Sequence, residues 1–297
     1  MTNLKKIGLT ALAGSLAAIG YAQAGSLSVN GTARMEYSTD STSTTSTDTL
    51  AQNSSITFSG SGELDNGMTV SYTSIQGATN ASTQNVKLDM GDMGAITMSS
   101  NDMAGIGTIA DKVPNGGEQP WDDNASAHGA PEQGIADPHG NPMLGYKTTV
   151  GGTTVSAAMS YDQNSPTTSI AVSFTGVEGL NVGAGVATDE DTSTTSQDIS
   201  TMYATYTMGN ISVGYQTTDV DVTAATSDIE RTAYGVSLAV NENMSVGYSI
   251  SDTEFEALSL DEENTGIGMS YTSGGMTLGI QNITKNNPEG ATGAQET

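Results

Sequence analysis

From residue 27 onward the chain falls into short stretches in which every second side chain is apolar. The stretch 27–37 opens the pattern, and the same alternation returns at residues 86–90, 155–161, 180–186 and 267–271. A period of two residues places one set of side chains on each face of a β-strand. The 3.6-residue spacing of a helix fits these stretches less well than the two-residue spacing of a strand. The sequence therefore predicts an all-β protein.

The connections between the expected strands alternate in length along the whole chain. Short turns rich in Gly and Asn stand near residues 65–67, 91–94, 151–152, 176–179, 208–210, 241–243 and 273–275. Longer polar connections stand near residues 39–53, 77–83, 101–141, 162–166, 188–197, 219–227 and 252–261. Gly and Asn accept the positive φ of tight hairpins, so each short turn marks a strand reversal. This arrangement predicts an up-and-down antiparallel β-barrel with about fifteen recognisable strands.

The same alternation predicts which face of the barrel meets water. A sheet of this many strands closes around a lumen too wide for side chains to fill. We therefore expect the polar set to line a wet interior and the apolar set to face hydrocarbon. Tyrosines recur at the strand ends, as at Tyr72, Tyr215 and Tyr248. They suit an interfacial girdle, although tyrosine is also simply a good strand former.

The first residues have the features of a secretory leader. Lys5 and Lys6 precede an uncharged apolar stretch, residues 7–20, and Ala22 and Ala24 have the spacing that signal peptidase requires. The apolar stretch is shorter than the ~20 residues of a spanning helix. We expect residues 1–24 to be a signal peptide, cleavage between Ala24 and Gly25, and a barrel over residues 25–297.

Composition narrows the function. The chain has 33 acidic and 8 basic residues, a formal net charge of -25, and no cysteine. The charge makes nucleic acid an unsuitable partner. Thiol catalysis is excluded, and no Gly-x-Ser-x-Gly, His-Glu-x-x-His or phosphate-binding glycine motif is present. We therefore expect the protein not to be an enzyme and to need no cofactor.

Several of these features together resemble the trimeric general-diffusion porins of Gram-negative outer membranes. They are the leader ending at Ala24, the opening strand, the segment 58–67 (Phe-Ser-Gly-Ser-Gly-Glu-Leu-Asp-Asn-Gly) and the alternation of short and long connections. The resemblance implies a homotrimer in outer-membrane lipid, a barrel of sixteen strands, and passive diffusion of small hydrophilic solutes and ions. Residues 286–290 read as a loop after the fifteenth candidate strand. We expect either that the closing strand is missing or that one strand is miscounted.

The connection 101–141 is the longest and carries the strongest functional signal. In the porins that the chain resembles, the third external loop folds inward and narrows the channel. The expected constriction-loop residues here are Asp102, Asp111, Glu118, Trp121, Asp122, Asp123, Glu132 and Asp137, with Lys112 as the accompanying base. The loop also carries His128 and His139, which with these acids suggest a metal site, but nothing fixes the ligand geometry, and a solvated loop is favoured.

The alternation assigns each charged residue within a strand to one face of the sheet. The residues predicted to line the pore are Arg34, Glu36, Lys87, Lys147 and Arg231. We hypothesise that the cations face the acidic loop across the narrowest part of the channel and that the channel prefers cations. The alternative is a set of scattered lumen charges, because cations avoid lipid in any case.

Other interpretations remain open at this stage. The acidic external connections 188–197, with Asp189, Glu190 and Asp191, and 252–261, with Asp252, Glu254 and Glu256, suit weak calcium binding or simple solvation. A substrate-specific outer-membrane channel is the nearest alternative function. A structural or adhesive surface protein would need a repeat of fixed length, and an outer-membrane enzyme would need catalytic groups at strand ends.

Overall fold

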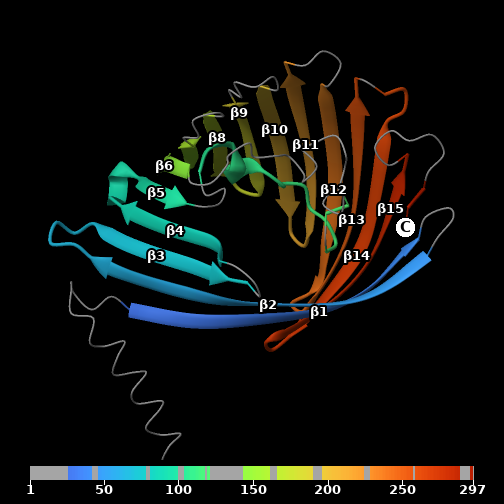
Figure 1. The fold of residues 1–297 in the computed structure, drawn as a ribbon, viewed down its shortest axis with the longest axis horizontal. Coiled ribbons are helices and arrows are strands. Elements are labelled where there is room, and N and C mark those ends of the chain that lie inside the picture. The colour runs from blue at the N-terminus through green and yellow to red at the C-terminus, as the bar shows by residue number, and fades with distance from the viewer. Residues whose placement is uncertain are drawn as a thin grey trace, which may run out of the picture.

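The computed structural model describes residues 26–41, 46–77, 81–99, 104–117, 119–120, 143–160, 166–189, 196–223, 228–256, 258–287 and 295–296. These residues form one antiparallel sheet in which each strand pairs with the next along the chain. Figure 1 shows the sheet curving around a concave interior, with the strands in chain order. The predicted leader, residues 1–24, lies outside the described residues.

The strands follow the expected stretches closely. They are β1 (Ser26–Ser41), β2 (Ser46–Glu63), β3 (Thr69–Gln76), β4 (Ala81–Asp89), β5 (Ala95–Ser99), β6 (Met143–Val150), β7 (Thr153–Ser160), β8 (Thr167–Val177), β9 (Leu180–Asp189), β10 (Gln197–Met208), β11 (Ile211–Val222), β12 (Ile229–Asn241), β13 (Met244–Phe255), β14 (Glu262–Ser273), β15 (Met276–Asn286) and β16 (Gln295–Glu296). Two 3₁₀ turns, η1 (Gly91–Met93) and η2 (Gly105–Ile109), complete the described elements. The prediction of an up-and-down antiparallel sheet is confirmed.

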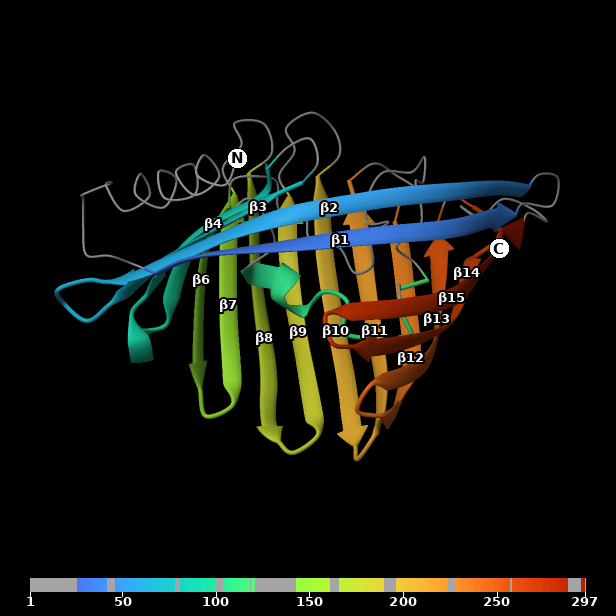
Figure 2. The same cartoon turned by 90° about the horizontal axis from the view of Figure 1, so that it is seen from below.

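The tight turns gather at one end of the sheet. Figure 2 shows the turns that join β6 to β7, β8 to β9 and β10 to β11 side by side at this end. At the β2–β3 turn, Gly67 has a φ of 80° and its N–H donates to the Leu64 carbonyl at 2.8 Å. Positive φ favours glycine, which is why the sequence marks this end so clearly.

The predicted connection 39–53 differs most in extent from the structure. Residues 39–53 were expected to form a loop, but β1 continues to Ser41 and β2 begins at Ser46. Tyr37 pairs with Leu50, and Thr39 pairs with Asp48. Most residues of this hairpin are exposed, so they need no alternation of apolar and polar side chains, while its threonines favour extended backbone.

The two faces of the sheet can be assigned from contacts and register. The segment that includes η2 lies on the concave side and packs against Gly145 of β6 and Gly235 of β12. Residues paired directly across neighbouring strands share a face. The apolar set, including Val172, Met202 and Ile267, therefore points outward, and it is exposed. A row of exposed apolar side chains on the convex face is what a wall facing hydrocarbon requires.

The edges of the sheet are β1 and the short β16. β16 pairs with Lys285 and Asn286 of β15, and among the described residues no pairing joins β1 to β15 or β16. The described sheet thus has fifteen full strands and a two-residue sixteenth, and it is not closed. No helix in the described part of the chain has the length and apolar character needed to cross a membrane.

The outward orientation of Met202 gives a direct stability prediction. Met202 lies midway along β10 and is 57% exposed. Met202→Arg places a cation in hydrocarbon, so we expect the free energy of unfolding in phospholipid vesicles to fall by about 2–4 kcal/mol. Met202→Leu is the matched control and should unfold at the denaturant concentration of the unsubstituted chain. Equal stability of the two variants would mean that this face does not meet lipid.

Candidate pore constriction

A segment of the longest connection lies inside the curved sheet. We call residues 104–117 the strap; it follows β5, contains η2 and crosses the concave faces of the strands from β6 to β14 (Figures 1 and 2). The strap belongs to the third long connection, which the sequence analysis expected to turn inward. The strap therefore occupies space that a channel would otherwise leave open.

The beginning of the strap is hydrogen-bonded to serines on the wall. The Gly105 N–H donates to Ser156 Oγ of β7 at 2.8 Å, and the Ile106 N–H donates to Ser169 Oγ of β8 at 3.0 Å. Both serines are buried. A buried backbone N–H without a partner would be costly, so these hydroxyls make it possible for the strap to lie flat against the wall.

An apolar pocket holds the next turn of the strap. Ile106 and Ile109 are each 1% exposed. They pack with lumen-side residues Ala171, Ala187, Ile199, Tyr203, Val220 and Ile229. Burial of an isoleucine side chain contributes about 1.5–3 kcal/mol. The lumen wall is thus apolar locally, at the place where the strap covers it.

The side chain of Gln216 of β11 bonds to the middle of the strap through both its carbonyl and its amino group. Its side-chain carbonyl accepts from the Lys112 N–H at 2.8 Å, and its side-chain amide donates to the Ile109 carbonyl at 2.8 Å. The same amide donates to Thr201 Oγ1 at 3.2 Å. Gln216 is fully buried. One side chain therefore satisfies an acceptor and a donor of the strap backbone, because an amide carries a donor and an acceptor on separate atoms.

The strap carries two charged residues, Asp111 and Lys112, beside the Gln216 anchor. Asp111 is exposed and has a φ of 50°, a conformation that aspartate tolerates better than most residues. Burial lowers the pKa of the Lys112 ammonium; the Asp111 carboxylate opposes this shift, and the Lys147 ammonium adds to it. The ammonium groups of Lys112 and Lys147 therefore lie close enough to repel each other, although the Lys112 backbone is bonded to β11 and Lys147 belongs to β6.

The cations predicted to line the pore lie on the lumen face, but they differ in surroundings. Arg34 forms an ion pair with Glu36 at 2.9 Å, and Lys87 forms one with Asp89 at 2.9 Å. Each pair joins residues two apart in one strand, so both members point to the same face. The two-residue spacing is readable in the sequence, so Asp89 could have been predicted as a pore-lining partner of Lys87. Lys147 is exposed.

Arg231 is buried, at 7% exposure, in a polar region of the inner wall that the sequence analysis missed. Its Nε donates to Thr253 Oγ1 at 2.9 Å. Nearby on β14, Asn264 Nδ2 donates to Glu262 Oε1 at 2.7 Å and to Ser251 Oγ at 3.3 Å. The alternation in the sequence places these polar residues of β13 and β14 on the lumen face. It does not show that they are buried, because burial depends on which other segments pack against the inner wall.

Most of the predicted constriction-loop residues lie outside the described residues. These are Asp102, Glu118, Trp121, Asp122, Asp123, Glu132 and Asp137, and the same holds for His128 and His139. Asp111 is the predicted acidic residue of this loop that lies among the described residues, and its side chain is exposed. The alternative of a metal site at the histidines therefore also lies outside the described residues.

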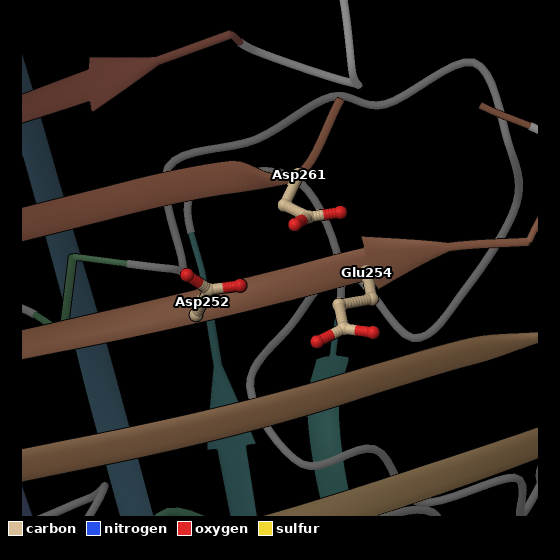
Figure 3. Close-up of side chains that lie close together, drawn as sticks. All are labelled: Asp252, Glu254 and Asp261. Atoms are coloured by element: carbon tan, nitrogen blue, oxygen red, sulfur yellow. The ribbon is translucent and has the colours of Figure 1, made fainter. Parts of the chain in front are cut away.

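A second acidic group lies away from the strap, at the long-connection end of the sheet. Asp252, Glu254 and Asp261 each offer a carboxylate oxygen within 4.8 Å of the other two (Figure 3). Asp252 and Glu254 share the outward phase of β13 with Val246 and Tyr248, so the group lies on the outer side of the wall. Glu256 is not part of it, and Glu190 and Asp191 lie outside the described residues.

Solved structures with the same architecture are porins and outer-membrane proteins. A porin refined at 1.8 Å resolution has a TM-score of 0.66 and 19% identity, covering 87% of this chain and 94% of its own. An anion-selective porin from Comamonas acidovorans has a TM-score of 0.65 and 16% identity, covering 88% of each chain. OmpT, an outer membrane protein of Vibrio cholerae, has a TM-score of 0.66 and 12% identity, covering 94% of this chain and 97% of its own. At these identities the likeness concerns the fold.

Comparison of the sequence with models of protein families identifies the family of this chain. No curated protein matches the chain significantly. The family model described as Gram-negative porin, in contrast, matches residues 8–281. This match spans the opening strand, the strap and most of β15, the same elements that build the curved sheet and its internal constriction. The chain therefore belongs to the Gram-negative porin family.

Proposed function

We propose that this porin forms a water-filled channel through which small hydrophilic solutes and ions diffuse passively across the bacterial outer membrane. The observation that carries the proposal is the strap, which lies on the concave face and narrows the interior of a sheet whose convex face is apolar. A polar lumen with an internal restriction suits size-limited diffusion. The arrangement calls for no catalytic group and no cofactor.

We also propose that the channel prefers cations over anions. The charges of Arg34 and Lys87 are offset by Glu36 and Asp89 on the same strand faces, and Arg231 is buried. The chain as a whole has a net charge of -25. Acidic loop residues around the strap would then set the sign of the field in the constriction. The fold alone does not fix selectivity, since a structurally similar porin is anion-selective.

The assembly proposed is a homotrimer in outer-membrane lipid, reached after removal of residues 1–24 as a signal peptide. The support is the family and the fold, and a trimer form of OmpT from Vibrio cholerae shares that fold, with a TM-score of 0.61 and 12% identity. Weak calcium binding stays a prediction. It is supported by the three carboxylates Asp252, Glu254 and Asp261, because calcium takes oxygen ligands.

Single-channel recording in a planar lipid bilayer tests the channel and its oligomeric state together. We expect ohmic current steps that appear and disappear in groups of three equal sub-steps, because each protomer encloses its own lumen. Heat-unfolded protein at the same concentration is the control and should give no steps. Isolated single steps would contradict the trimer, and a complete absence of steps would contradict the channel.

Reversal potentials in a salt gradient test the selectivity. We expect a reversal potential whose sign shows cation preference. We expect the double variant E36Q/D89N to shift the reversal potential toward anions, because two negative charges beside Arg34 and Lys87 are removed. Asp65→Asn, in the β2–β3 turn, removes an acid outside the lumen and is the matched control. Anion preference of the unsubstituted channel would refute the proposal.

A further inference from the structure

Beyond Gln216 the strap runs across strands whose lumen-facing residues at the contact are glycines. They are Gly214 of β11, Gly235 of β12, Gly247 of β13 and Gly268 of β14. Gly214 pairs directly with Gly235, and Gly247 pairs directly with Gly268. The four residues thus form two cross-strand pairs under residues 113–116 of the strap.

The first pair carries Val113 and Pro114. A Cβ added to Gly235 would lie 2.6 Å from Val113 Cγ1 and 3.0 Å from the Pro114 carbonyl carbon, and it would collide with the Pro114 carbonyl oxygen. A Cβ added to Gly214 would collide with Pro114 Cδ and lie 3.4 Å from Pro114 Cγ. Neither position has room for any side chain while the strap stays where it is.

The second pair meets the strap at another glycine, Gly116. A Cβ added to Gly268 would lie 2.7 Å from the Gly116 carbonyl oxygen, and one added to Gly247 would lie 2.5 Å from the Gly116 nitrogen. A Cβ added to Gly116 itself would lie 2.5 Å from the Gly268 carbonyl oxygen and 2.7 Å from that of Gly247. Backbone therefore packs on backbone from both sides.

Backbone conformation does not explain these glycines. None of Gly214, Gly235, Gly247 and Gly268 is among the glycines with positive φ. Glycine inside a strand weakens it, and one reason for its presence there is the close approach of another backbone. At these four positions the approaching backbone is the strap.

We propose that Gly214, Gly235, Gly247 and Gly268 are positioning residues that form a seat for the strap and thereby set the bore of the channel. The seat lets the strap lie at the smallest distance from the wall that packing allows, and any side chain there moves the strap toward the lumen axis. The size of solute that passes is then determined by residues that touch no solute. This inference rests on the proposed channel function.

Valine substitutions test the seat, and the chain offers a matched control. Gly279 of β15 lies on the same lumen face, but nothing lies within 4 Å of a Cβ added there. We expect Gly235→Val and Gly247→Val to lower the single-channel conductance by about twofold or more and to slow the entry of larger sugars into proteoliposomes more than that of small ones. Gly279→Val should leave both readouts unchanged, since its side chain enters open space.

The outcomes separate the seat from the channel function. Unchanged conductance and unchanged sugar selectivity in Gly235→Val and Gly247→Val would overturn the seat, and so would an equal loss in Gly279→Val. Absence of conductance in the unsubstituted protein would overturn the proposed function instead. A purely structural role would lower stability without changing the ratio of large to small sugar entry, and that result would also overturn the proposal.

A cross-link keeps the proposal testable if the valine variants do not fold. Val113 of the strap packs against Ala233 of β12, and both are buried. The chain has no cysteine, so the double variant V113C/A233C offers a single disulfide between strap and wall. We expect oxidation and reduction of this pair to give the same conductance, because the strap already rests on the wall. A change in conductance on oxidation would show that the open channel needs a strap position away from the seat.

Discussion

The fold depends on one constraint, that the backbone N–H and C=O groups form hydrogen bonds with each other where the hydrocarbon of a membrane excludes water. In hydrocarbon each unpaired N–H or C=O costs several kcal/mol, so a membrane-spanning sheet must pair every strand with its neighbours. Consecutive antiparallel pairing meets this requirement between neighbouring strands of the described sheet, while the outer edge of β1 is unpaired there and that of β15 is paired at two residues. The alternation of side chains then follows, because the same pleat that pairs the backbone sends successive residues to lipid and to water.

The strap meets the same requirement by different means. Its backbone runs across the strands instead of along them, so no sheet ladder is available to it. Side chains of the wall replace the ladder: Ser156 and Ser169 accept N–H groups at its start, and Gln216 pairs with both a carbonyl and an N–H in its middle. Where these side chains end, glycines bring the two backbones into contact. The constriction is thus built as a second layer on the wall.

The sequence predicted the elements that depend on local chemistry. Strands, tight turns and the faces of Arg34, Lys87, Lys147 and Arg231 follow from alternation and from residues that accept positive φ. The extension of β1 and β2 toward Ser41 and Ser46 was missed because most residues of that hairpin are exposed and its composition is polar. Strand-forming threonines were the available signal, and it is weaker than alternation.

Features that depend on contacts between distant residues could not be predicted. Gln216 looks like any polar lumen residue until the strap, about a hundred residues earlier in the chain, is placed against it. Gly235 and Gly247 are glycines inside strands, and nothing in the sequence shows that the strap packs against them. The ion pair of Lys87 with Asp89 was within reach of sequence reasoning, whereas the burial of Arg231 was not.

The central claim is that alternate residues of each strand face lipid and water, and nitroxide scanning measures this most directly. Since the chain has no cysteine, single cysteines at positions 55–59 of β2 can each carry one spin label. In lipid vesicles we predict that oxygen relaxes labels at Ile56 and Phe58 more strongly, and that a water-soluble nickel complex relaxes labels at Ser55, Thr57 and Ser59 more strongly. Uniform relaxation along the strand, or the opposite alternation, would contradict the account.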